Sequence, residues 1–189
     1  MTQPAQDAEA VALMQRMGGG DRQALAQLIG LYGRGMRTYC ARVLDQTSDA
    51  EDAAQEVFLR VCSGARSYDP GKASVATWTY RIALRHCIDR NRRARVRRFF
   101  GMAGVEMPEV EDPSPDALRT LAARQELAQV RRVVAEMPDR QRQALLLKVV
   151  AEMETAEIAA AMGTGPGAVE QLLVRARARL REEAGLDRK

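Results

Sequence analysis

Arginine side chains at helical spacing form the first candidate binding site of this sequence. The segment Arg81–Arg98 carries eight arginines against a single acid, Asp89. On a helix, Arg81, Arg85 and Arg92 fall near one face because they are four and seven residues apart. A guanidinium presents several donors in one plane and matches a phosphate. Such a stripe can follow a nucleic-acid backbone, and a solvated basic face is the alternative interpretation.

Aromatic side chains flank the loop ahead of this stripe. Tyr68 precedes the loop "DPGKASVAT", and Trp78 and Tyr80 follow it. Rings beside a basic helix can hold an unstacked base. Core packing is the simpler interpretation for Trp78 and Tyr80, so we expect them in the interior.

Two helices joined by a glycine-containing turn form a second candidate site. The apolar spacing of Thr155–Met162 predicts a short helix that Gly163 ends, and Pro166 suits the first turn of the next helix. This pattern is typical of a helix-turn-helix, whose second helix enters the major groove of DNA. A plain helical hairpin is the alternative. The residues expected to point outward at the start of the second helix are Gly167, Glu170, Gln171, Val174 and Arg175.

A third candidate surface is acidic. The segment "DAEDAAQEVF" begins at Asp49 and carries an apolar stripe of Ala, Val and Phe on one side. Acids in a first helical turn are ordinary partners of the helix dipole, but Gln55 and Glu56 lie past that turn. An acidic face in a basic protein favours a protein partner over DNA. The residues on this face are Asp49, Glu51, Asp52, Gln55 and Glu56.

The elements that position these residues are all expected to be helices. The chain has 189 residues, a net charge of +4, 46% hydrophobic and only 4% aromatic residues, and it is rich in Ala, Leu, Arg, Glu and Gln, which favour helices. Thr47 or Ser48 is the expected cap of the third helix. The expected helices are 8–17, 22–44, one opening near 47–48, 75–98, 117–135, 138–151, 155–162 and 165–184.

A change of composition after the basic helix predicts two domains. Residues 101–117 contain three Pro, two Gly and five acids without a base, which is typical of a flexible linker. We therefore expect an all-α protein with two small helical domains, at 8–98 and 117–185, joined by an acidic linker at 99–116.

Composition also narrows the function classes. The start lacks a signal-peptide pattern, and no apolar run approaches the roughly 20 residues that span a membrane. The three cysteines, Cys40, Cys62 and Cys87, have no paired spacing and are expected to be buried, reduced thiols. His86 is the only histidine, and no metal-ligand or Ser/His/Asp pattern is present. The sequence therefore predicts a cytoplasmic protein that is not an enzyme and has no cofactor, metal or small-molecule substrate.

The basic helix, the helix-turn-helix and the acidic helix together resemble those of a known family. "DAEDAAQEVFLRV" (Asp49–Val61) resembles the helix with which sigma factors bind the clamp coiled coil of RNA polymerase. "WTYRIALRHCIDRNRR" (Trp78–Arg93) resembles the helix that opens the promoter −10 element. "MPDRQRQALLL" together with "AEIAAAMGTGPGAVEQLLVRARARLRE" resembles the sigma domain that reads the −35 element. The chain is thus similar to the small two-domain sigma factors of the extracytoplasmic-function (ECF) type, over about 8–184.

The resemblance implies partners and roles. The partners are core RNA polymerase (clamp coiled coil and flap), promoter DNA and an anti-sigma factor, and the genes served would belong to a stress or envelope response. The implied polymerase contacts are Asp49, Glu51, Asp52, Gln55, Glu56 and Arg60. The implied −10 contacts are Lys72, Ser74, Thr77, Arg81, Arg85, Arg92 and Arg93. The implied −35 contacts are Arg140, Arg142, Thr164, Pro166, Gly167, Glu170, Gln171, Val174, Arg175 and Arg177.

Some positions depart from the family pattern. Thr79 stands where Leu is usual, Arg85 where Asn is frequent, and Glu170 where Lys or Arg is typical. Two other functions remain as alternatives. One is a two-domain regulator that senses a ligand and binds a palindrome as a dimer, and the other is an enzyme. The basic helix inside the supposed sensor domain argues against the first, and the lone His86 argues against the second.

Overall fold

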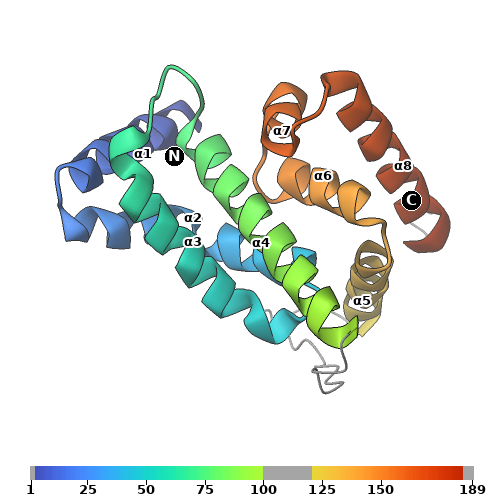
Figure 1. Ribbon diagram of the computed structural model, residues 1–189. Coiled ribbons are helices and arrows are strands. Elements are labelled where there is room, and N and C mark those ends of the chain that lie inside the picture. Colours follow the sequence, from blue (N-terminus) through green and yellow to red (C-terminus); the bar gives the residue numbers. More distant parts are fainter. Residues whose placement is uncertain (1–2, 100–120, 185–189) are drawn as a thin grey trace.

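The structure is a computed structural model that describes residues 3–99 and 121–184. Those residues form eight α-helices and two short 3-10 helices, with no strand among them (Figure 1), which confirms the all-α prediction. The 3-10 helices are η1 (Thr47–Asp49) and η2 (Ala65–Ser67). The α-helices are α1 (Gln3–Gly18), α2 (Arg22–Val43), α3 (Ala50–Gly64), α4 (Val75–Phe99), α5 (Leu121–Ala135), α6 (Asp139–Val149), α7 (Thr155–Met162) and α8 (Pro166–Ala184).

Helices α1–α4 pack around a shared apolar core. Asp21 begins α2 by accepting a hydrogen bond from the Gln23 N–H at 2.8 Å, which satisfies one donor of the first turn. Tyr39 of α2 is fully buried and meets Tyr80 of α4 edge to face, with ring centroids 5.5 Å apart. Tyr80 therefore lies in the core, as expected. The buried residues of α3 are Ala50, Ala53, Ala54, Val57, Phe58 and Val61, which are the apolar stripe of the sequence.

Two cysteines belong to this core. Cys40 and Cys87 are free and buried, with their sulfur atoms 3.9 Å apart. The hydrogen bond with Cys40, followed by burial, raises the pKa of the Cys87 thiol. A raised pKa favours the neutral thiol of Cys87, which is a poor nucleophile. Cys62 is also free and is half-buried.

The start of α3 differs from the expectation. The 3-10 turn η1 precedes it, and the N-cap residue is Asp49, whose side chain makes no capping hydrogen bond. The prediction of a Thr47 or Ser48 cap is therefore wrong. The Asp49 carboxylate instead accepts a hydrogen bond from Arg90 of α4 at 2.9 Å, because α4 passes close enough to compete for it.

Helices α5–α8 form the second group. Helix α7 ends at Gly163, whose φ of 62° and ψ of 45° are left-handed, a conformation that glycine adopts at little cost. The Gly165 carbonyl accepts a hydrogen bond from the Val169 N–H at 3.2 Å as α8 begins. Val169, Leu173 and Ala176 of α8 are buried. The predicted helix–turn–helix at 155–184 is thus present.

The two groups of helices pack against each other, with α4 running between them (Figure 1). Helix α7 contacts α4, and α6 contacts α2. At Gly35 of α2 a Cβ atom would lie 2.5 Å from the Tyr80 hydroxyl and 3.7 Å from the Val150 carbonyl. Gly35 is therefore a position where α2, Tyr80 and Val150 pack so closely that a larger residue would not fit.

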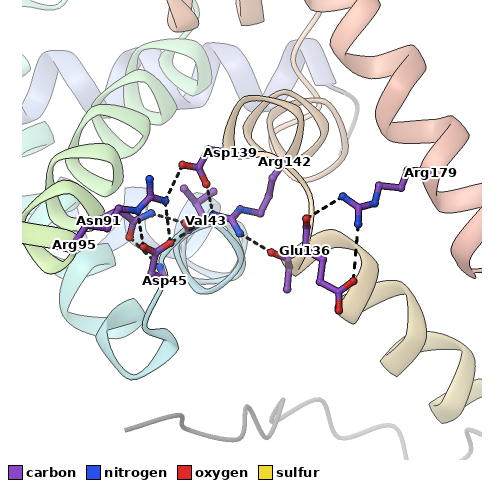
Figure 2. A network of polar contacts seen from close by, with 9 residues as sticks. Val43, Asp45, Asn91, Arg95, Glu136, Asp139, Arg142 and Arg179 are labelled. Carbon is purple, nitrogen blue, oxygen red and sulfur yellow. Dashed lines mark hydrogen bonds and ion pairs between the residues drawn. The ribbon is translucent and has the colours of Figure 1, made fainter. Parts of the chain in front are cut away.

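A network of hydrogen bonds and ion pairs stabilises the contact between the two groups of helices (Figure 2). Arg142 of α6 is 7% exposed and donates hydrogen bonds to the Ala135 carbonyl at 2.9 Å, to Asp139 at 3.0 Å and to the Val43 carbonyl at 3.3 Å. Arg95 of α4 bonds Asp45 at 3.1 Å and Asp139 at 2.8 Å. These two carboxylates therefore each face two guanidinium groups. The expected linker, 99–116, lies outside the described residues except for Phe99.

Candidate nucleic-acid and polymerase interfaces

The acidic face of α3 points outward, as the sequence predicted. Glu51, Asp52 and Gln55 are exposed, while Asp49 and Glu56 are half-buried. Arg60 is exposed and pairs with Glu56 at 3.0 Å. Glu51 lies 3.7 Å from Arg37, whereas Asp52 makes no ion pair with any residue that the structure describes. Asp52 is thus the acid of this face that is most available to a partner.

The start of α4 is covered by α7. The Glu157 carboxylate accepts hydrogen bonds from the hydroxyls of Ser74, at 3.2 Å, and Thr77. Partial burial tends to raise the pKa of Glu157, but the bonds from Thr77, the Glu154 N–H and Ser74, together with the Lys148 charge, hold that pKa below its usual value. Ser74 and Thr77, two predicted −10 contacts, are therefore hydrogen-bonded to the other group of helices in this arrangement.

Lys72 stays apart from this contact. It lies in the loop before α4 with its side chain 82% exposed and 3.2 Å from Asp69. Trp78 is half-buried against the core and meets Tyr68 edge to face at 5.6 Å. The ring therefore serves packing here, in agreement with the core interpretation.

A groove of about 830 Å³ is lined by α4, α6 and the end of α7. Arg85 and Arg92 line it from α4, and Arg140 lines it from α6. All three are exposed, whereas Arg81 is half-buried. The structure thus gathers cations from the predicted −10 and −35 groups around one groove. Arg93 is exposed on a different face of α4, toward α3.

The outer face of α8 presents a row of exposed residues. Val174 is 55% exposed, and its apolar side chain on this surface is available to a partner. Thr164, in the preceding turn, is half-buried. The predicted −35 residues that are exposed on α8 are Pro166, Gly167, Glu170, Gln171, Val174, Arg175 and Arg177.

Arg142 does not join that row. Its side chain is 9% exposed and points into the network with Val43, Asp45 and Asp139 (Figure 2). In this arrangement it fixes the contact between α2 and α6 and cannot reach DNA. Sequence reasoning missed this network because Asp45, Asn91, Arg95 and Asp139 stand in unrelated segments, and no local pattern relates them.

Comparison with known proteins identifies both groups of helices. Residues 28–97 match the family described as Sigma-70 region 2, and residues 127–180 match Sigma-70, region 4. The RNA polymerase sigma factor NccH of Alcaligenes xylosoxydans xylosoxydans is 32% identical over 181 residues, which cover 95% of both chains. The ECF RNA polymerase sigma factor SigM of Mycobacterium tuberculosis is 36% identical over 164 residues, covering 85% of this chain and 77% of SigM.

Two solved structures share the fold. CnrH in complex with the cytosolic domain of CnrY has a TM-score of 0.68 at 23% identity, covering 95% of this chain and 99% of CnrH. RpoE in complex with the anti-sigma factor NepR, from Bartonella quintana, has a TM-score of 0.72 at 23% identity, covering 86% of this chain and 98% of RpoE.

The chain belongs to the sigma-70 family of RNA polymerase sigma factors, in its ECF group. Its activity is therefore transcription initiation: it binds core RNA polymerase and directs it to −35 and −10 promoter elements. No helix in the described ranges is long and apolar enough to cross a membrane. Among the same residues, no three His, Cys, Asp or Glu side chains are grouped where they could hold a metal ion.

Proposed function

We propose that the candidate surfaces divide the work of this sigma factor. The acidic face of α3, from Asp49 to Arg60, binds the clamp coiled coil of polymerase. In the loop and α4, the −10 element is bound by Lys72, Ser74, Thr77, Arg81, Arg85, Arg92 and Arg93. The exposed face of α8 with Arg140 reads the −35 element. The observation that carries this division is that Glu51, Asp52 and Gln55 are exposed on α3, whereas Arg85 and Arg92 of α4 line the groove toward α6 and α7. The domains are placed at 8–98 and 117–185, with residues 99–116 as the linker.

The −10 surface requires the two groups of helices to separate. Ser74 and Thr77 are hydrogen-bonded to Glu157, so a DNA strand reaches them only when α7 moves away. Binding to polymerase and to both promoter elements would supply the differential affinity that favours the open arrangement. Two weak DNA contacts then suffice, because polymerase tethers them and raises their effective concentration.

Regulation and location follow from the same assignment. RpoE of Bartonella quintana, a structural neighbour, is bound to an anti-sigma factor. An anti-sigma factor that covers the same surfaces would hold this chain inactive until a stress or envelope signal releases it. The chain would act in the cytoplasm, without enzymatic activity or a small-molecule substrate.

Transcription from a promoter library tests this function. Purified core RNA polymerase is incubated with the library in the presence and absence of the full-length chain. We expect transcripts from a subset of promoters only when the chain is present, and those promoters should share −35 and −10 sequences. If no transcript depends on the chain while the chain alone binds a palindromic duplex, the ligand-sensing regulator becomes the better assignment.

Glu170 is expected to set one position of the −35 preference. Its carboxylate is exposed on α8, and a carboxylate can accept a hydrogen bond from the amino group of cytosine while repelling phosphate. Glu170→Ala should therefore relax the preference at one base pair, with a change of about 1–3 kcal/mol in discrimination. Reporter assays on single-base −35 variants measure it, and an unchanged ranking of those variants would contradict the assignment.

A further inference from the structure

A basic pocket between α3 and α4 is not accounted for by the proposed function. It has a volume of about 250 Å³ and is polar. Along α4 its residues are spaced by three and four, which places them on one face of the helix. That face differs from the one on which Arg85 and Arg92 line the groove toward α7. The lining residues are Arg60 of α3 and His86, Asp89, Arg90, Arg93 and Arg97 of α4.

Two cations of this pocket have no counter-charge among the residues that the structure describes. Arg60 pairs with Glu56 at 3.0 Å, and Arg90 pairs with Asp49 at 2.9 Å. Arg93 and Arg97 are exposed and make no ion pair within the part of the chain that the structure describes. They lie four residues apart on one helix, where like charges repel. An anion placed between them would remove that repulsion.

After Glu56 and Asp49, Asp89 is the third carboxylate near the pocket, and it does not pair with Arg93 or Arg97. Asp89 lines the pocket, and one of its oxygens lies 3.5 Å from Arg92. The pocket therefore presents four guanidinium groups against one carboxylate.

His86 adds an independent sign of an incomplete site. It is the only histidine of the chain and lines the same pocket. Its Nε2 atom is covered and has no hydrogen-bond partner among the described residues. Burial first, and then the charges of Arg60, Arg90 and Arg93, lower the pKa of the imidazole, with Glu56 opposing them. The ring is thus neutral at pH 7 beside a group of cations.

We propose that this pocket binds a phosphate group, held by Arg93 and Arg97 and flanked by Arg60 and Arg90. Guanidinium groups make charge-assisted hydrogen bonds to phosphate with two parallel donors each. The volume of about 250 Å³ suits a phosphate or pyrophosphate and lies below the range of pockets for larger ligands. The source is either a backbone phosphate of nucleic acid or a free phosphorylated molecule. The site goes beyond the proposed function, which gives Arg60 and Arg93 separate roles and gives none to His86, Arg90 and Arg97.

The lone histidine allows a direct test by nuclear magnetic resonance on the full-length chain. The His86 ring signals are followed while inorganic pyrophosphate, a single-stranded DNA oligonucleotide or hexaglutamate is added at constant ionic strength. We expect a saturable change in these signals and a higher pKa of His86, because a bound anion stabilises the imidazolium form.

Two variants locate the response. Arg93→Gln with Arg97→Gln should weaken binding at least about tenfold, because it removes the two guanidinium groups that have no ion pair among the described residues. Both side chains are exposed, so the fold should persist. The matched control is Arg22→Gln with Arg132→Gln, which removes the same charge at two exposed positions outside the pocket and should keep the affinity within about twofold.

The outcomes separate the sources of phosphate. A response to pyrophosphate and DNA that is lost only in the pocket variant supports a backbone phosphate. A response to pyrophosphate alone supports a free phosphorylated molecule. No saturable change with either probe overturns the site, and so does a response to hexaglutamate alone, which would indicate an acidic protein segment. Failure here leaves the proposed function intact, because that function is tested by promoter-dependent transcription.

Discussion

Asp52→Arg is expected to lower the affinity for core RNA polymerase at least about tenfold, which corresponds to roughly 1.4 kcal/mol. Asp52 is exposed in the acidic face of α3, and it has no ion pair among the described residues to offset its charge. Close charge pairs across an interface couple by about 1.5–7 kcal/mol. Reversing this charge turns an attraction into a repulsion if polymerase presents cations to α3. Equilibrium binding of a labelled full-length chain to purified core polymerase measures the change.

The control for this variant is Glu9→Arg. Glu9 is exposed on α1, so the substitution raises the net charge by the same amount at a distance from the acidic face. Asp52 also lies in the first turn of α3, where reversing its charge costs about 0.3–1 kcal/mol of helix stability. Circular dichroism must therefore show a folded variant. Equal affinity of the two variants for polymerase would refute the role of the acidic face.

Arg142→Met is expected to lower the free energy of unfolding by about 2–4 kcal/mol. The Arg142 side chain is 9% exposed, and its loss leaves the Ala135 and Val43 carbonyls without this donor. It also removes one of the guanidinium groups that face Asp45 and Asp139. Denaturant unfolding followed by circular dichroism measures the loss as a lower midpoint.

Arg140→Met provides a matched control two residues earlier on the same helix. Arg140 is exposed and lines the groove between α4 and α6, so its replacement should change stability by no more than about 0.5 kcal/mol. It should nevertheless weaken binding to −35 DNA if Arg140 reaches a phosphate. Equal destabilisation by the two variants would contradict the structural role of Arg142.

Most of the helical architecture could be predicted from local pattern. The boundaries of α2, α7 and α8 agree with the expected ranges within one residue. The apolar stripe of Ala, Val and Phe predicted for α3 is the face that is buried. The prediction works because apolar periodicity is a local property that survives in almost any packing. The predicted α3 cap was wrong because a 3-10 turn over Thr47–Asp49 makes Asp49 the N-cap residue. Its carboxylate is bonded to Arg90, which is distant in the sequence.

The sequence by itself determined which segments are helices, which faces are apolar and where acidic and basic residues gather. Only the tertiary structure decided which of those charges are free. Arg140 and Arg142 look alike in the sequence, yet one is exposed and the other bonds residues of a distant helix. Ser74 and Thr77 likewise meet Glu157 across about eighty positions. Helical pattern depends on neighbours three or four residues away, whereas the partner of a charge depends on contacts that only the packed chain brings together.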